Sequence, residues 1–228
     1  MNDAEQTVLS RAPLFEALDE EGARALRQKV AEVRLARGDR LFGEGDDGEC
    51  LYVVLDGKIK LTRAAPDGRE NLLSVLGPGE MFGELSLFDP RPRTSSASAV
   101  TDARLAALAH DALRPWLTGR PGVAMHLLRA LAQRLRRTND VMADLVFTDV
   151  PGRVAKALLD LADRFGQQQA DGLHVHHDLT QEELAQLVGA SRETVNKALA
   201  DFAARGWLHI SAKSVVLIEP DRLRRRAR

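Results

Sequence analysis

The feature that most constrains the fold is an unbroken stretch in the middle of the chain. Residues 123–150 contain neither glycine nor proline. Because these two residues are the strongest helix breakers, the stretch predicts the longest helix of the chain. Short apolar runs precede it and helical patterns follow it. The 228-residue chain is therefore predicted to form two ordinary domains joined by this helix.

This helix carries an apolar seam whose members lie at alternating steps of four and three residues. They are Ala124, Leu128, Leu131, Leu135, Thr138, Met142 and Leu145. Such heptad spacing is typical of a helix that pairs with another helix. We expect a homodimer, because charged residues occupy most of the remaining helix surface. The alternative is that the seam packs on the barrel of its own chain.

The part before the helix is rich in short strand-like runs. LYVVL, KIKLTR and NLLSVL alternate with turn-forming stretches such as APDGRE and LGPGE. Short strands at close spacing, separated by Gly, Pro and Asp, predict an antiparallel barrel or sandwich over about residues 30–108. The run DEEGARALRQKV predicts a helix ahead of it.

The part after the helix predicts a winged helix-turn-helix. A helix over VPGRVAKALLDLADRFG is followed by two short amphipathic helices. The first has Thr180 as its N-cap, Glu183 at the capping-box position and Gly189 as its stop, and the second opens at Ser191. Two such helices joined by a tight glycine turn form a helix-turn-helix. The runs GWLHI and VVLIE then predict a two-stranded hairpin, the wing.

The second helix of this pair presents groups that could distinguish base pairs. Val195 and Leu199 point inward, which leaves Arg192, Glu193, Asn196 and Lys197 on the outward surface. Arg and Lys can donate to guanine, and Glu can accept from cytosine. The alternatives are an ordinary solvated helix face and a helix-turn-helix that mediates protein contacts. The wing favours DNA.

A second candidate site is the stretch GELSLFDPRPRTSS, residues 83–96. It places Glu84 beside a glycine and Arg93 before three hydroxyl residues. An acid and a base in isolation would most simply form a salt bridge that caps the barrel. The Arg-Thr step and the glycine before the acid favour a bound ligand instead, because glycine permits close backbone approach and an arginine fork matches phosphate oxygens.

Composition and charge exclude several classes. The net charge of -1 does not indicate a nucleic-acid binder, although residues 150–228 are mildly basic, with 12 Lys plus Arg against 10 Asp plus Glu. The single cysteine, Cys50, excludes an internal disulfide and a four-cysteine metal site within one chain. It is predicted as a small buried strand residue, and the alternative is a redox-sensing thiol, for which the chain has no second, resolving cysteine. No apolar run is long enough to span a bilayer, and the acidic N-terminus lacks secretory features. A cytoplasmic, nucleoid-associated protein is predicted.

Catalysis is the first rival interpretation. Barrels of this kind also serve as metal-dependent cupins, but these need several histidines inside the barrel and only His110 falls near it. The run HVHH, residues 174–177, permits a zinc hypothesis, and a solvated strand is the preferred interpretation because no cysteine lies nearby. No GxSxG or P-loop lysine motif occurs. We therefore predict no enzyme, no catalytic residue and no metal site.

Two long motifs, in the same order, carry a resemblance to a known family. GEMFGELSLFDPRPRTSSASA and DLTQEELAQLVGASRETVNKAL, with TDVPGRVAKALL between them, resemble the cyclic-AMP receptor protein branch of the CRP/FNR transcription-factor superfamily, and actinobacterial members most closely. The similarity covers nearly the whole chain. It implies an α+β multidomain fold: an antiparallel β-roll or jelly-roll cyclic-nucleotide-binding domain over 1–119, a dimerisation helix and hinge over 120–149, and a winged helix-turn-helix over 150–228.

The resemblance also implies which residues bind cyclic AMP. Backbone groups at the start of a short helix would face the cyclic phosphate, Glu84 would accept from the ribose 2'-hydroxyl, and an Arg-Thr pair would complete the phosphate site. Helix positions would reach the purine, in part from the opposite subunit, and Asn139 stands there where well-known members have serine. The implied residues are Leu73, Ser74, Gly83, Glu84, Leu85, Ser86, Arg93, Thr94, Thr138 and Asn139.

For DNA, the resemblance assigns base reading to Arg192, Glu193 and Lys197, and phosphate contacts to Thr180 and Ser191. Lys197 stands where the family pattern has arginine, so it keeps the charge but lacks the planar fork. Two chains related by a dyad would prefer palindromic DNA with TGTGA-like half-sites about one helical turn apart.

The expected protein is thus a homodimeric transcription regulator, either an activator or a repressor. Cyclic AMP would be its allosteric effector, with nucleotide binding coupled to the binding of double-stranded DNA. RNA polymerase is expected as a further partner. One alternative keeps the fold but has weak or no cyclic-AMP dependence. Another replaces the signal, as in relatives that sense through an iron-sulfur cluster or haem. A third is a nucleotide-binding module like the regulatory subunits of kinases. No cofactor is predicted.

Overall fold

The structure, a computed structural model, describes residues 3–227. The chain divides into two compact units, one of Met1–Gly68 with Leu73–Arg136 and one of Arg69–Leu72 with Arg137–Arg228. The division falls inside the longest helix, α6 (Pro121–Phe147), which is the helix predicted from the unbroken stretch. No helix of the described residues is both long and apolar enough to cross a membrane.

Two four-stranded antiparallel sheets form the first unit, with strand orders β1-β8-β3-β6 and β2-β7-β4-β5. The predicted antiparallel roll is therefore confirmed. The strands are β1 (Ala31–Leu35), β2 (Arg40–Phe42), β3 (Cys50–Asp56), β4 (Ile59–Ala64), β5 (Glu70–Leu76), β6 (Met81–Phe82), β7 (Ser96–Ala99) and β8 (Ala103–Ala109). A short helix, α4 (Leu85–Phe88), follows β6 and carries the predicted ligand motif.

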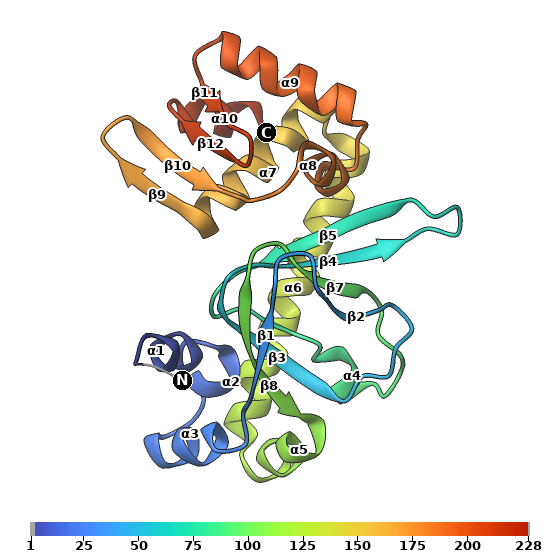
Figure 1. Ribbon diagram of the computed structural model, residues 1–228, viewed down its shortest axis with the longest axis vertical. Helices are drawn as coiled ribbons and strands as arrows, with labels where there is room; N and C mark the ends of the chain where they lie inside the picture. The colour runs from blue at the N-terminus through green and yellow to red at the C-terminus, as the bar shows by residue number, and fades with distance from the viewer. Residues whose placement is uncertain (1–2, 228) are drawn as a thin grey trace. The chain divides into compact units, whose positions relative to one another are not determined.

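Helices gather at one end of this roll, as Figure 1 shows. They are α1 (Asp3–Ser10), α2 (Pro13–Glu16), α3 (Glu20–Arg27) and α5 (His110–Gly119). Their apolar side chains share a core with β3 and β8, in which Leu14, Leu26, Leu51 and Leu108 are completely buried. Burying leucines of this kind contributes on the order of 2 kcal/mol each.

The beginning of α6 packs on the same core through a face other than its heptad seam. Val123 and Leu127 are completely buried. The seam residues Leu128, Leu135 and Met142, in contrast, leave 53%, 61% and 61% of their surface exposed. Within the first unit, the seam residues Leu128 and Leu135 are therefore not covered by the barrel, which argues against the alternative considered from the sequence.

The second unit contains a helix-turn-helix and a sheet of order β11-β12-β10-β9. Its elements are α7 (Val150–Phe165), β9 (Gly166–Gln169), β10 (Gly172–His176), α8 (Gln181–Val188), α9 (Arg192–Ala204), β11 (Leu208–Ile210), β12 (Ser214–Leu217) and α10 (Pro220–Arg226). The predicted hairpin β11-β12 exists, but β12 also pairs with β10, where Val175 faces Val215. Both valines are buried, so the wing is an extension of a larger sheet.

The histidine run before the helix-turn-helix is not a solvated strand throughout. His174 and His176 belong to β10, but His177 is buried, with 2% of its surface exposed. Its Nδ1 accepts a hydrogen bond of 3.1 Å from the Leu179 backbone N–H. No group of three His, Cys, Asp or Glu side chains in residues 3–227 is placed to hold a metal ion.

Arg153, on the first turn of α7, joins the ends of two other helices. Its guanidinium donates to the carbonyl oxygen of Thr148, just after α6, at 2.8 Å. It also donates to the carbonyl oxygens of Val188 at 3.0 Å and Gly189 at 3.2 Å, at the end of α8. These are the carbonyls that a helix leaves without an internal partner, so one cation satisfies both helix ends.

Asp149 caps α7 and joins it to α10. Its Oδ1 accepts from the Gly152 backbone N–H at 3.0 Å, and its Oδ2 accepts from the Arg226 guanidinium at 2.5 Å. The hydrogen bond from Arg226, followed by that from Gly152, lowers the pKa of Asp149 below its ordinary value of 3.8. A carboxyl whose pKa is lowered by folding stabilises the folded protein at pH values above its ordinary pKa. This stabilisation is lost as the pH falls through the lowered pKa.

An Asp149→Ala variant should therefore be less stable by about 1 to 2 kcal/mol at pH 7, as for the loss of other N-caps. The difference should shrink as the pH falls below 3.8, because the carboxyl of the unaltered protein becomes protonated. Calorimetry of the full chain at several pH values measures both effects. Asp160→Ala, which removes an exposed carboxylate from the same helix, serves as the control and should change stability by less than about 0.5 kcal/mol.

Candidate functional site: a pocket in the roll and an exposed recognition helix

Gly83 allows the chain to turn tightly between β6 and α4. Its φ of +81° is one that side chains other than glycine rarely adopt. A Cβ there would lie 2.7 Å from Nη1 of Arg93 and 2.9 Å from the carbonyl oxygen of Cys50. The glycine is thus needed both for the backbone conformation and for the place of Arg93.

Arg93 is held against the backbone of this turn. It is 6% exposed, and its two terminal nitrogens donate to the carbonyl oxygens of Gly83 at 2.9 Å and Cys50 at 2.7 Å. The guanidinium carbon lies 4.3 Å from the centre of the Phe42 ring, a cation-π contact. Its Nε is buried and has no hydrogen-bond partner among the described residues. An unpaired buried donor is costly, which favours a ligand that accepts from it.

Glu84 is paired with an arginine from α6 rather than with Arg93. Its side chain is 2% exposed, and Oε1 accepts from Nη1 of Arg134 at 2.8 Å. Its other oxygen, Oε2, is buried and has no partner within residues 3–227. The structure therefore does not contain the Glu84–Arg93 salt bridge that was the simplest alternative from the sequence.

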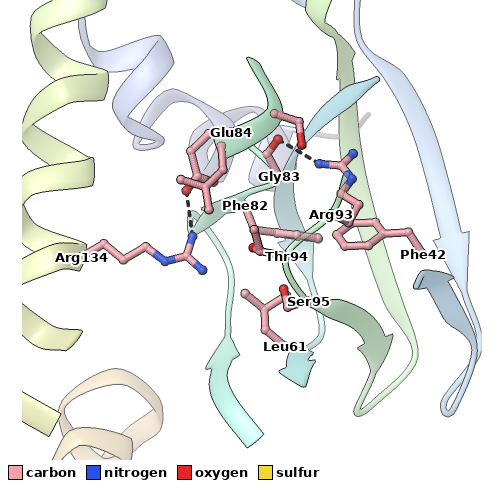
Figure 2. A pocket seen from close by; sticks show the side chains of 11 residues that line it. Phe42, Leu61, Phe82, Gly83, Glu84, Arg93, Thr94, Ser95 and Arg134 are labelled. Carbon is pink, nitrogen blue, oxygen red and sulfur yellow. Dashed lines mark hydrogen bonds and ion pairs between the residues drawn. The ribbon is translucent and has the colours of Figure 1, made fainter. Parts of the chain in front are cut away.

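These groups line one pocket with about 320 Å³ of empty space, part of it open to solvent. Figure 2 shows Glu84 and Arg134 meeting on one side and Arg93 with Phe42 on the other. Its lining residues are Phe42, Leu61, Phe82, Gly83, Glu84, Leu85, Ser86, Arg93, Thr94, Ser95 and Arg134. The pocket combines an acceptor, several donors and an apolar wall, which suits an anion that also carries a hydroxyl and a flat ring.

Six of the ten residues predicted for the ligand line this pocket: Gly83, Glu84, Leu85, Ser86, Arg93 and Thr94. Leu73 and Ser74 lie on β5 and are not part of its lining. Thr138 and Asn139 are exposed on α6, in the half of that helix that belongs to the second unit. Their assignment stays a prediction.

Sequence reasoning missed five lining residues, namely Phe42, Leu61, Phe82, Ser95 and Arg134. A signal existed for Arg134, because it precedes Thr138 by four residues and so shares a helix face with a predicted ligand residue. Phe42 lies on β2 and had no local signal, since only the fold brings it beneath the guanidinium of Arg93.

Burial is the main cause of the shifted pKa values of three groups near Arg93, namely Cys50, Tyr52 and His110. Burial raises the pKa of the Tyr52 hydroxyl and of the Cys50 thiol. Burial, and then the positive charge of Arg93, lower the pKa of His110. Cys50 lies on β3 as predicted, but it is half-buried rather than buried. A thiol with a raised pKa is a poor nucleophile, which favours a structural role for Cys50.

Replacing Gly83 with alanine should weaken ligand binding by about tenfold or more, because the new Cβ would displace Arg93. Titration calorimetry with cyclic AMP measures the change. Gly38→Ala is a matched control, since Gly38 has a φ of +90° but open space around its missing Cβ. Both variants carry the strain of about 1 kcal/mol, so equal losses of affinity would contradict the steric role of Gly83.

The second candidate site is α9, the second helix of the helix-turn-helix. Val195, Ala198, Leu199 and Phe202 are buried and hold the helix on its unit. The outward positions Arg192, Glu193, Asn196 and Lys197 are all exposed. The two faces are thus divided as the sequence predicts, and the exposed face carries both donors and acceptors for base edges.

Side-chain caps fix the two helices at their predicted starts. Thr180 and Glu183 form a capping box at α8, with hydrogen bonds of 3.1 Å and 2.8 Å. Gly189 ends that helix in the left-handed conformation, with a φ of 69°. Ser191 caps α9 by accepting from the Thr194 backbone N–H at 3.2 Å. The recognition helix is therefore oriented by local chemistry.

Glu193 and Lys197 pair with each other in this structure, at 2.7 Å, although both are about three-quarters exposed. Such an exposed pair is worth only a few tenths of a kcal/mol, so it can be broken at little cost when the two side chains meet other partners.

A β-roll with a buried acid and arginine in one pocket, together with a winged helix-turn-helix, defines a ligand-responsive transcription regulator. Models of known families agree with this class. A cyclic nucleotide-binding domain matches residues 32–118, and a Crp-like helix-turn-helix domain matches residues 152–226.

The chain belongs to the CRP/FNR family of transcription regulators. It is 57% identical to the CRP-like cAMP-activated global transcriptional regulator of Mycobacterium tuberculosis, over 97% of this chain and 99% of that protein. It is 36% identical to the cyclic AMP receptor protein of Thermus thermophilus, over 91% and 93%. Among solved structures, the c-di-GMP responsive regulator CLP of Xanthomonas campestris matches with a TM-score of 0.75 and 28% identity, over 87% of this chain and 99% of that one.

Proposed function

We propose that this protein is a homodimeric transcription regulator whose affinity for palindromic DNA is controlled by cyclic AMP. The observation that carries the proposal is the pocket in which Glu84 and Arg93 each keep a buried polar atom without a partner. A cyclic nucleotide supplies both missing partners, because its ribose hydroxyl donates and its phosphate oxygens accept. The names of the two relatives at 57% and 36% identity support cyclic AMP as the effector.

Arg134 gives this pocket a link to α6. It pairs with Glu84, and the predicted purine contact Thr138 lies one helical turn further along the same helix. Ligand binding at Glu84 therefore acts directly on the dimerisation helix. We propose that this contact biases the hinge around Asp149 and Pro151, which in turn sets the two recognition helices of the dimer.

Dimerisation would cover the exposed seam of α6. Leu128, Leu135, Met142 and Leu145 are 50% to 61% exposed, and they recur at heptad spacing along one face. A two-fold dimer would present Arg192, Glu193 and Lys197 twice and would therefore prefer palindromic DNA.

The remaining predictions belong to the same proposal. The domain bounds are 1–119, 120–149 and 150–228. The ligand site is completed by Leu73, Ser74, Leu85, Ser86, Thr94, Thr138 and Asn139. Thr180 and Ser191 contact DNA phosphates. The regulator works in the cytoplasm at the nucleoid, contacts RNA polymerase and catalyses no reaction.

Fluorescence anisotropy of a labelled duplex with TGTGA half-sites tests the proposal at fixed salt, with and without cyclic AMP. We expect specific binding that cyclic AMP strengthens, and the ratio of the two affinities gives the coupling free energy. A scrambled duplex is the control, because phosphate contacts alone would bind both duplexes alike. Equal affinity for the two duplexes would contradict a sequence-specific regulator.

A second effector is tested in the same experiment, because the CLP protein is described as responsive to c-di-GMP. Cyclic di-GMP is added in place of cyclic AMP. The single buried acid and arginine of this pocket suit one phosphate and one ribose, so cyclic AMP should change DNA binding and cyclic di-GMP should not. If cyclic di-GMP changes DNA affinity and cyclic AMP does not, cyclic di-GMP is the effector.

A further inference from the structure

His110 is a buried histidine that lies close to Arg93 but does not line the ligand pocket. It begins α5 at the end of β8, and its backbone N–H donates to the carbonyl oxygen of Glu49 at 2.8 Å. The pairing of Ala109 with Cys50, between β8 and β3, brings the histidine beside Cys50. Its side chain is 6% exposed, so any effect of His110 on a ligand passes through its neighbours.

The ring of His110 lies beside the two carbonyls that hold the Arg93 guanidinium. The backbone carbonyls of Gly83 and Cys50 are close enough to favour a proton on the ring. In this structure they accept from the terminal nitrogens of Arg93 instead, at 2.9 Å and 2.7 Å. Nε2 of His110 is buried and has no hydrogen-bond partner among residues 3–227. The imidazole is thus a second possible donor for carbonyls that Arg93 occupies.

The positive charges around the ring disfavour its protonation. Arg93 lowers the pKa of His110 below 6.5 more than Arg114 does, and burial lowers it most. Arg114 is on α5 itself and pairs with Asp111 at 3.6 Å. Without ligand, His110 is therefore neutral at pH 7. The charged or titratable groups on the segments around the ring are Glu49, Cys50, Tyr52, Glu84, Arg93 and Arg114.

We propose that His110 is a positioning residue for Arg93 that takes up a proton from the solvent when the phosphate of the cyclic nucleotide binds. This inference rests on the proposed function of the pocket. The phosphate brings a negative charge to Arg93, which offsets the positive charge that disfavours a proton on the histidine. A guanidinium nitrogen that turns to the phosphate leaves its carbonyl, and the protonated ring then donates to that carbonyl in its place.

Binding of the nucleotide and binding of the proton therefore strengthen each other. A ligand that raises the pKa of a group binds more tightly as the pH falls from above the raised pKa to the ligand-free one. The ligand-free pKa of His110 lies below 6.5. The affinity for cyclic AMP should thus rise by about threefold or more between about pH 8 and about pH 5.5.

Titration calorimetry of the full chain with cyclic AMP measures this linkage. Experiments in buffers of different ionisation enthalpy count the protons exchanged, and we expect uptake of a substantial fraction of one proton per subunit near pH 6.5. A His110→Asn variant cannot titrate at this place, so it should lose the uptake and most of the pH dependence. At about pH 8 it should bind cyclic AMP nearly as tightly as the unaltered protein.

A His209→Asn variant, which removes an exposed histidine from the second unit, is the control and should keep both effects. A histidine with a merely structural role would, on replacement, weaken binding by the same factor at every pH. Absence of proton uptake in the unaltered protein, or equal uptake in His110→Asn, would overturn the proposal.

NMR of the unaltered protein tests the same point without any variant. With the ring resonances of His110 assigned through the backbone, its pKa should be higher at saturating cyclic AMP than without ligand. An unchanged pKa would contradict the proton uptake.

The outcomes separate this inference from the function on which it rests. If the protein binds cyclic AMP without taking up protons, the role of His110 is wrong and the proposed function stands. If it binds no cyclic AMP at any pH, the proposed function fails and the role of His110 with it.

Discussion

A Glu84→Gln variant is expected to bind cyclic AMP about 30- to 100-fold more weakly than the unaltered protein. Its two oxygens face different partners: Oε1 meets Arg134 at 2.8 Å and Oε2 is buried without one. A glutamine has one oxygen and one NH₂ group, so it can serve Arg134 or the ribose hydroxyl but not both. This loss of affinity corresponds to about 2 to 2.7 kcal/mol, which lies within the range for charge-assisted hydrogen bonds.

The 2'-deoxy form of cyclic AMP makes this test specific. It should bind the unaltered protein weakly, because the carboxylate loses its donor, and it should lose little further affinity to Glu84→Gln. Titration calorimetry of the four combinations gives the coupling between the two groups. Asp89→Asn, an exposed neutralisation outside the pocket, controls for charge alone. If removing the 2'-hydroxyl weakens binding to Glu84→Gln as much as it weakens binding to the unaltered protein, Glu84 does not hold the ribose.

An Arg192→Ala variant is expected to lose about 100-fold or more in affinity for the palindromic duplex. Arg192 begins α9 and is exposed, and Ser191 caps the helix just before it, so its side chain can enter the major groove. One good contact to a base pair contributes about 1 to 3 kcal/mol, and a dimer makes it twice. Fluorescence anisotropy at fixed salt and saturating cyclic AMP measures the loss.

The comparison between duplexes separates base reading from charge. The variant should lose much less affinity for a scrambled duplex, and it should discriminate less at one base pair of each half-site. Arg205→Ala removes the same kind of side chain just beyond α9 and should bind the palindrome normally. An equal loss on both duplexes would make Arg192 a phosphate contact instead.

Features with local causes were predictable from the sequence. The capping box of Thr180 and Glu183, the glycine stop and the length of α6 all follow from neighbouring residues, and all are present. The acid and arginine of the ligand motif could be predicted to share a pocket, because a short segment joins them.

Features that depend on distant segments were not predictable in this way. Arg134 meets Glu84 from a helix 50 positions away in the sequence, and Phe42 reaches Arg93 from strand β2. The pairing of β10 with β12 likewise enlarged the predicted wing, and it buried Val175 within a stretch that had suggested a solvated strand. Such long-range contacts leave no signal in a local pattern.

The guanidinium of Arg153 makes loosening of the second unit cooperative. Because one side chain donates to the carbonyl of Thr148 and to the carbonyls at the end of α8, displacement of that side chain leaves both helix ends without these partners at once. Locally unfolded states, in which the turn of the helix-turn-helix is open, should therefore be rarely populated. Proteases that cut at such openings should find few sites there, and the turn should exchange its amide hydrogens together with the end of α6.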